Sequence, residues 1–332
     1  MLPSVMNKRL LLLLSAALVC VLPMCDQVEG PLPAGSIKAA DPEAEALMQQ
    51  AEGFRTAGKL RQARRSLKKL VRYHVAAPEA PAARFMLAQI EEALNDPREA
   101  FKQYGRVVEK YQGSPLYEQA LNRQLAMGMA AARGELKGRV LGTWEVPMES
   151  SVVVEWLQSV IKNAPYNDMS ATAMSVLADY QVRQKRYEEA CATYQKLVEN
   201  YPDSRYAPAA QMMVAQLWAA SHTRGNQNLV NLANAQEAYE EFTLRFPNHP
   251  DVAKAHSQAA RVRSLLVQQE LEVGRYYLER AREYPSAIFC FENVIRQQKV
   301  NPEAAREATR LLQRARQHVA AQKTSGGTPA RS

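Results

Sequence analysis

The sequence contains few of the residues that favour β-structure. Its 332 residues include only 14 glycines and 7 phenylalanines, and stretches rich in β-branched and aromatic residues are nearly absent. Alanine, leucine, glutamate, glutamine and arginine dominate instead, and most of these residues have high helix propensity. The composition therefore predicts an all-α fold, arranged either as two ordinary domains or as one extended array.

Motifs that carry catalysis or bind cofactors are also missing. HExxH, CxxC, GxSxG, P-loop and dinucleotide-binding glycine patterns do not occur. His249 and His256 are seven residues apart and form no recognisable zinc site, and Glu188 and Glu189 are expected to lie exposed on a helix. The sequence thus predicts a protein that is not an enzyme and that holds no metal ion or other cofactor.

Residues 1–25 have the layout of an export signal. Lys8 and Arg9 precede an apolar run, Leu10 to Leu22, that is too short to span a bilayer. Leu22-Pro23-Met24-Cys25 resembles a bacterial lipobox, in which the cysteine is acylated and becomes the new N-terminus. Cys25 is therefore the predicted lipidation site, and several acyl chains would anchor the protein stably. The alternative is a cysteine without a role inside an ordinary signal peptide.

Two further segments are predicted to lie outside the folded part. Residues 26–42 contain several prolines and glycines without an apolar period, so we expect a flexible tether with a reach of roughly 20–25 Å. Asp26 would, by enteric sorting rules, favour retention in the inner membrane, which leaves the retaining membrane open. Residues 321–332 are predicted to form a disordered tail.

The chain repeats parts of its own sequence. The decapeptide PAARFMLAQI, from Pro81 to Ile90, returns as PAAQMMVAQL, from Pro208 to Leu217, with six of ten positions identical. Such repetition is typical of stacked supersecondary units. Six copies of the repeat can be aligned on a small or branched residue, and each copy predicts a helix. These alignment positions are Ala63, Ala100, Val153, Ala190, Ala235 and Ala287. Each of these helices is expected to be the second helix of a unit, with an aromatic or leucine residue four positions later filling the gap to the next unit, as Tyr104 and Tyr194 do.

The spacing between these second helices varies from 37 to 53 residues. Two short helices need about 34 residues, so loop insertions are expected where the spacing is long. Residues 134–147 and 222–232 are the expected positions. Cys191 and Cys290 lie about two units apart, which is too far for a disulfide, and both are predicted to be free, buried thiols.

The pattern over residues 43–320 resembles the tetratricopeptide repeat. Its most typical fragment is Gly58-Lys59-Leu60, with Ala63 three residues further on. The resemblance implies about six helical hairpins stacked into a curved solenoid, and a protein that acts by binding other proteins.

Residues 270–296 are similar to the last repeats of the BamD family, lipoproteins that assemble β-barrels in the outer membrane. The residues that carry this similarity are Tyr276, Tyr277, Arg280, Ala287, Ile288, Phe291 and Glu292. The resemblance implies a lipid-anchored scaffold on the periplasmic face of the bacterial outer membrane. Its expected partners are the core subunit of the β-barrel assembly machine and unfolded outer-membrane proteins.

The same segment supplies the predicted partner-binding residues Arg275, Tyr276, Tyr277 and Arg280, because tyrosine and arginine are favoured interface anchors. For the two tyrosines, packing between repeats is the alternative. A second functional hypothesis is a periplasmic repeat adaptor that coordinates envelope constriction or peptidoglycan synthesis. Such adaptors usually carry an N-terminal coiled coil, and no heptads precede residue 43.

A basic stripe is predicted on the second helix of the first repeat unit. Arg61, Arg65, Lys68 and Arg72 recur at helical spacing, in a chain whose formal net charge is +8. This stripe is a candidate membrane-facing surface for anionic lipid, and the alternative is a solvated helix face. No aromatic residues interleave with these charges, so nucleic-acid binding is not expected.

Overall fold

The computed structural model describes residues 31–33, 35–140, 144–165, 167–223 and 229–325. The predicted signal segment, including Cys25, and the start of the predicted tether lie outside these residues. The chain divides into two compact units, with the boundary between Asn163 and Ala164. Within the described residues, no helix is long and apolar enough to cross a bilayer.

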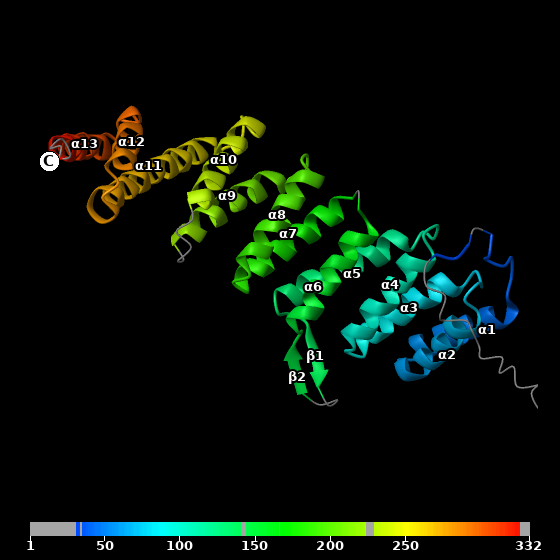
Figure 1. Ribbon diagram of the computed structural model, residues 1–332. Helices are drawn as coiled ribbons and strands as arrows, with labels where there is room; N and C mark the ends of the chain where they lie inside the picture. Colours follow the sequence, from blue (N-terminus) through cyan, green and yellow to red (C-terminus); the bar gives the residue numbers. More distant parts are fainter. Residues whose placement is uncertain (1–30, 34, 141–143, 166, 224–228, 326–332) are drawn as a thin grey trace, which may run out of the picture. The chain divides into compact units, whose positions relative to one another are not determined.

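Unit 1 consists of three helical hairpins and one short sheet (Figure 1). Its elements are α1 (Pro42–Thr56), α2 (Leu60–Tyr73), α3 (Ala80–Ala93), α4 (Pro97–Lys110), α5 (Tyr117–Ala132), β1 (Lys137–Val140), β2 (Trp144–Pro147) and α6 (Ser150–Asn163). Each helix packs against the next helix along the chain. The sheet is inserted between α5 and α6, which still pack against each other.

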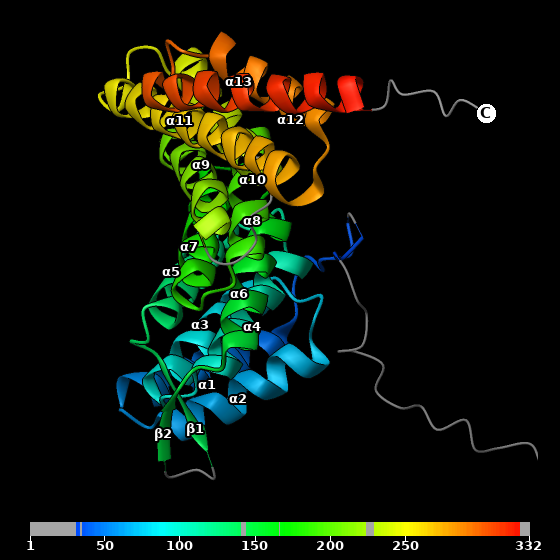
Figure 2. The ribbon, with the colours of Figure 1, turned by 60° about the vertical axis from the view of Figure 1, so that its left-hand side comes forward.

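Unit 2 consists of three more hairpins and a final helix that lies against the last of them (Figure 2). Its elements are α7 (Asp168–Arg183), α8 (Tyr187–Asn200), α9 (Ala207–Thr223), α10 (Leu229–Arg245), α11 (Val252–Tyr276), a π-helix (Tyr277–Ala281), α12 (Tyr284–Arg296) and α13 (Pro302–Ser325). The last helix continues past residue 321, where the predicted tail begins.

Side-chain caps and left-handed turn residues define where several helices begin and end. Asp41 and Asp96 cap α1 and α4 by accepting hydrogen bonds from backbone N–H groups three residues later. The turns inside three hairpins each use one residue with positive φ, namely Gly58 at 71°, Asn95 at 58° and Lys185 at 61°. A left-handed residue lets the chain leave one helix and enter its antiparallel partner within a few residues.

The second helix of every hairpin lies where the sequence predicts it. Ala63, Ala100, Ala190, Ala235 and Ala287 have no exposed surface, because each lies where its helix closely approaches a neighbouring helix. The side chains four residues later are buried as well: Leu67, Tyr104, Leu157, Tyr194, Tyr239 and Phe291. Both copies of the repeated decapeptide belong to first helices, α3 and α9.

The prediction of a loop at residues 134–147 is wrong, because most of this segment forms an antiparallel β-hairpin. Val140 pairs with Trp144 and Lys137 pairs with Pro147. Figures 1 and 2 show the hairpin projecting from the connection between α5 and α6. Its sequence signal is the set of β-branched and aromatic residues around Gly142, which favour a strand on either side of a turn.

The loop predicted at residues 222–232 is also wrong at both ends. Helix α9 continues to Thr223 and α10 already begins at Leu229. The long spacing between Ala235 and Ala287 also contains no long loop, because α11 alone has 25 residues. In unit 2 the extra residues therefore lengthen helices, whereas in unit 1 they form a sheet.

Candidate functional site

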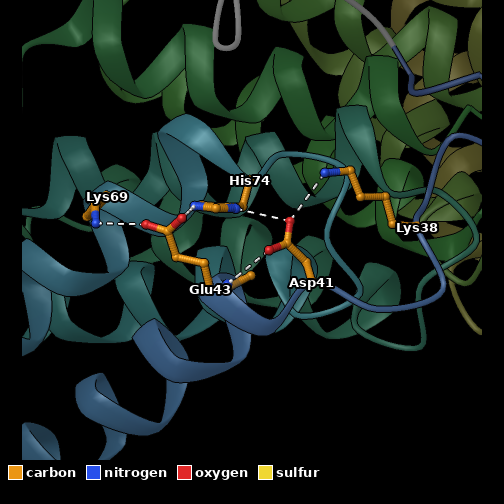
Figure 3. Close-up of polar contacts among 6 residues, drawn as sticks. Lys38, Asp41, Glu43, Lys69 and His74 are labelled. Atoms are coloured by element: carbon orange, nitrogen blue, oxygen red, sulfur yellow. Dashed lines mark hydrogen bonds and ion pairs between the residues drawn. The ribbon is translucent and has the colours of Figure 1, made fainter.

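A polar cluster holds the chain that leads into α1 against the first hairpin (Figure 3). Asp41 Oδ2 lies 3.0 Å from His74 Nδ1 and 3.4 Å from Lys38 Nζ. Its other oxygen, Oδ1, accepts a hydrogen bond from the backbone of Ala44. The hydrogen bond with His74 is the main cause that lowers the pKa of Asp41 to about 2. The adjacent Glu43 pairs with Lys69 at 3.0 Å, which lowers the pKa of Glu43.

Backbone hydrogen bonds extend this attachment along the segment predicted as a tether. The N–H of Leu32 donates to the carbonyl of Lys110 at 3.2 Å, and the N–H of Lys38 donates to the carbonyl of Ala76 at 2.8 Å. The side chain of Leu32 packs against the apolar core of the first hairpins. The described part of residues 26–42 therefore lies on unit 1.

The basic stripe predicted on α2 is exposed, but its four charges are not equivalent. Lys68 Nζ lies 3.0 Å from an oxygen of Glu91, a carboxylate that has no exposed surface. Arg61, Arg65 and Arg72 are exposed and form no ion pair among the described residues. Three of the four predicted charges are thus available to a partner, while Lys68 neutralises a buried carboxylate.

Glu91 belongs to a set of charged groups inside unit 1 that no pattern in the sequence predicts. Its second oxygen lies 3.3 Å from Arg64 Nη1. Arg84 is also almost fully buried, and it donates hydrogen bonds to Gln103 and to the carbonyl of Val71. Buried charges need such partners, since unpaired charges are costly in an apolar interior. The repeat pattern contains no signal for them, because it marks only the apolar positions.

A groove of about 720 Å³ lies on unit 1 beside the Tyr104 hydroxyl. This hydroxyl donates a 2.6 Å hydrogen bond to Glu92, and Arg123 pairs with the same carboxylate. Burial and the neighbouring carboxylate raise the pKa of Tyr104, so the phenol stays protonated. Arg55, at the end of α1, also lines the groove and has no ion pair among the described residues.

The structure divides the predicted partner-binding residues of unit 2 into two pairs. Arg275 pairs with Glu272 of its own helix and with Glu307 of α13, so it links two helices. Tyr277 packs against the apolar cluster of α11, α12 and α13. Tyr276 is 59% exposed, and Arg280 is exposed with no ion pair among the described residues. Of the four predicted residues, Tyr276 and Arg280 are therefore the exposed pair, whereas Arg275 and Tyr277 are partly buried.

The two described cysteines are buried and free, as predicted. Burial raises the pKa of Cys191 to about 11, and burial also raises the pKa of Cys290. A thiol with a raised pKa is a poor nucleophile at neutral pH. In the part of the chain that the structure describes, no group of three or more histidine, cysteine or acidic residues is arranged to hold a metal ion.

The class of this protein follows from its helical hairpins, each of which packs against the next within its unit. It is a tetratricopeptide-like repeat protein, an architecture suited to binding other proteins. Family models described as "Tetratricopeptide repeat" match residues 48–115 and residues 173–204.

One curated relative is the "Outer membrane protein assembly factor BamD" of Xylella fastidiosa (strain 9a5c). It is 24% identical over an alignment of 163 residues, and the match covers 41% of this chain and 54% of the relative. The match thus spans about half the length of that protein.

Several solved structures resemble the fold. A fragment of MamA from Desulfovibrio magneticus RS-1 is 15% identical, with a TM-score of 0.30, over 64% of this chain and 99% of that one. A tetratricopeptide repeat protein from Parabacteroides merdae ATCC 43184 is 14% identical, with a TM-score of 0.30, over 82% of this chain and 100% of that one. Similarities of this size bear on neither the partners nor the function.

Proposed function

We propose that this chain is a lipid-anchored scaffold on the periplasmic face of the bacterial outer membrane, where it takes part in the assembly of β-barrel proteins. The observation that carries the proposal is the 24% identity over 163 residues with an outer membrane protein assembly factor. The stacked hairpins support a role in binding, because repeat arrays offer extended surfaces to other chains.

The partner-binding surface would lie at the end of α11. Tyr276 supplies an exposed aromatic ring, and Arg280 supplies an exposed guanidinium that no described residue pairs with. Tyrosine and arginine are among the side chains that most often anchor interfaces. Arg275 and Tyr277 would act indirectly, by holding the π-helix against α12 and α13. π-Helices are frequent at functional sites, which supports this location.

Extended segments of unfolded barrel proteins would bind in the groove beside Tyr104. Arg55 and Gln89 are exposed in its lining and can bond to the main chain or to an acidic side chain of a substrate. Leu60 and Ile90 add apolar surface to the same groove. This combination suits a segment that alternates polar and apolar residues, as barrel strands do.

The membrane would be contacted in two ways. Acyl chains on Cys25 would anchor the protein, and Arg61, Arg65 and Arg72 of α2 would face anionic lipid. Each basic residue near such a surface contributes about 1 kcal/mol of attraction. A lipid anchor combined with a basic patch gives more stable membrane attachment than a single weak signal does.

Co-purification of the full chain from membranes in mild detergent tests the proposal. We expect a β-barrel assembly core subunit to be recovered with the wild type and to be lost with Arg280→Glu. Lys254→Glu, an exposed charge reversal at the other end of α11, is the matched control and should retain the complex. Recovery of peptidoglycan-synthesis proteins in place of the core subunit would refute the proposal and favour the envelope-constriction adaptor.

Cys25→Ser tests the anchor separately. We expect processing of the wild type to be sensitive to globomycin and the serine variant to keep its leader, because cleavage at a lipobox requires an acylated cysteine. Loss of the leader from the serine variant, or processing of the wild type that is insensitive to globomycin, would rule out lipidation at Cys25.

A further inference from the structure

Unit 2 contains a groove of about 320 Å³ that is lined by α8, α9 and α10. Helix α9 packs against both α8 and α10, as Figure 1 shows. Val198, Val214 and Ala238 are buried in the groove lining, and the indole of Trp218 is partly exposed beside them. The groove therefore has an apolar base that includes one accessible aromatic ring.

Two carboxylates in this groove have no partner in the part of the chain that the structure describes. Glu199 of α8 and Glu237 of α10 are exposed, and neither forms an ion pair or hydrogen bond among the described residues. Glu241, by contrast, is already engaged: it accepts a 3.0 Å hydrogen bond from Gln211 and lies 3.5 Å from Arg245. The lining thus carries more acidic than basic groups, in a chain whose formal net charge is +8.

Helices α8 and α10 each carry an amide side chain close to the exposed carboxylate. Gln195 precedes Glu199 by four residues on α8, and Asn234 precedes Glu237 by three residues on α10. Residues at these spacings are neighbours on one helix face. Amide side chains can donate to a main-chain carbonyl and accept from a main-chain N–H. Both helices therefore offer one group for a peptide backbone and one group for a cation.

We propose that this groove binds an extended segment of a basic polypeptide. Lysine or arginine side chains of the segment would pair with Glu199 and Glu237, because no described residue neutralises these carboxylates. Trp218 would receive the aliphatic part of such a side chain or its cationic head, since indole is the ring that attracts cations most strongly. Gln195 and Asn234 would bond to the main chain. The groove is separate from the surfaces assigned above, so this inference does not depend on the proposed function.

Fluorescence anisotropy with the full chain tests the inference. The probe is a fluorescein-labelled octapeptide of alternating arginine and threonine, and the matched probe has glutamine in place of arginine. We expect the arginine peptide to bind and the glutamine peptide to bind at least about tenfold more weakly, which corresponds to about 1.4 kcal/mol. Binding of the arginine peptide should weaken as salt increases.

Variants then locate the site. The double variant Glu199→Gln with Glu237→Gln should weaken binding of the arginine peptide by about tenfold. The control is Glu188→Gln with Glu303→Gln, which makes the same charge change at two exposed positions of unit 2 outside the groove. It should leave the affinity unchanged. Trp218→Leu should weaken binding without altering the salt dependence.

Three outcomes would overturn the proposal. The first is equal affinity for the arginine and glutamine peptides, and the second is unchanged affinity in the Glu199 and Glu237 double variant. The third is an equal loss in the control pair, which would mean that overall charge governs binding. Far-UV circular dichroism of each variant separates these outcomes from unfolding. Residues used in the co-purification test are unaltered, so the two proposals can fail independently.

Discussion

The two units share one hairpin architecture but differ in where they place charge. Inside unit 1, the described buried residues include Arg84, Glu91 and Lys110. The buried polar residues of unit 2, among those described, are all uncharged: Ser170, Gln181, Gln211 and Asn231. On the surface the contrast is between the basic α2 and the acidic groove of α8 and α10. The repeat thus specifies helix positions and leaves the polar chemistry of each unit free to differ.

Removal of the buried arginine of unit 1 should have the largest effect. Arg84→Ala is expected to lower the free energy of unfolding by about 3 kcal/mol, because it empties a large buried volume and leaves hydrogen-bond acceptors without a donor. Gln211→Ala in unit 2 is the matched change and should cost about 1 kcal/mol, since it removes an uncharged donor. Urea unfolding followed by far-UV circular dichroism measures both. Equal losses would mean that the charged interior has no special weight.

Reversal of the exposed stripe tests the contrast at the surface. Changing Arg61, Arg65 and Arg72 to glutamate should weaken binding to anionic vesicles by at least about 100-fold, or about 3 kcal/mol, because three attractive charges are lost. Lys68 is left in place because it pairs with Glu91. Co-sedimentation with vesicles of mixed phosphatidylglycerol and phosphatidylcholine gives the measurement.

The control for the stripe lies in unit 2. Lys196, Lys254 and Arg310 are exposed and can be reversed to glutamate with the same change in net charge. Vesicle binding should then remain close to that of the wild type. If both triple variants lose binding equally, net charge and not the face of α2 governs attachment.

Two glycines test how tightly the helices of each unit pack. A Cβ on Gly274 would lie 2.6 Å from a ring carbon of Phe291, so Gly274→Ala in unit 2 should cost about 2 kcal/mol. A Cβ on Gly128 would lie 3.0 Å from Leu157 Cδ2, the end of a flexible side chain. Gly128→Ala in unit 1 should therefore cost less than about 1 kcal/mol, as helix propensity offsets the contact. Thermal unfolding compares the two; a larger loss for Gly128→Ala would reverse the prediction.

The smallest expected effect concerns pH. The folded protein lowers the pKa of Asp41 to about 2, whereas an unfolded aspartate titrates at about 3.9. The stabilising contribution of Asp41 is therefore complete above about pH 4 and is lost as the pH falls towards 2. Asp41→Asn should reduce the loss of stability between these values, as measured by urea unfolding at several pH values. An unchanged pH dependence in this variant would contradict the role of the cluster in Figure 3.

Much of the helical frame could be predicted from the sequence, because it depends on residue size at regular spacing. Ala63 and Ala287 mark buried positions in second helices more than 200 residues apart, and both have no exposed surface. The β-hairpin does not follow from the helical repeat, because an interruption of the repeat predicts only a connecting segment. The β-branched and aromatic residues around Gly142 are a local strand signal that is independent of the repeat.

The candidate sites were predicted less completely, for a physical reason. Lys68 lies in register with Arg61, Arg65 and Arg72 on α2, yet its ammonium group neutralises Glu91 of α3. Arg275 and Arg280 lie five residues apart in the same predicted partner-binding segment. Arg275 forms an ion pair with Glu307, which is 32 residues further along the chain. Partners from another helix decide whether a charge is available, and spacing within one helix contains no information about them.

The sequence by itself therefore determined the helical hairpins and the apolar seams between them, because small and large residues at helical spacing dictate which faces approach. It also determined that α2 would be basic. The tertiary structure decided which of those charges remain unpaired, and it brought the free carboxylates of α8 and α10 into one groove. Electrostatic pairing acts between segments that are distant in the chain, so only the folded arrangement of helices reveals it.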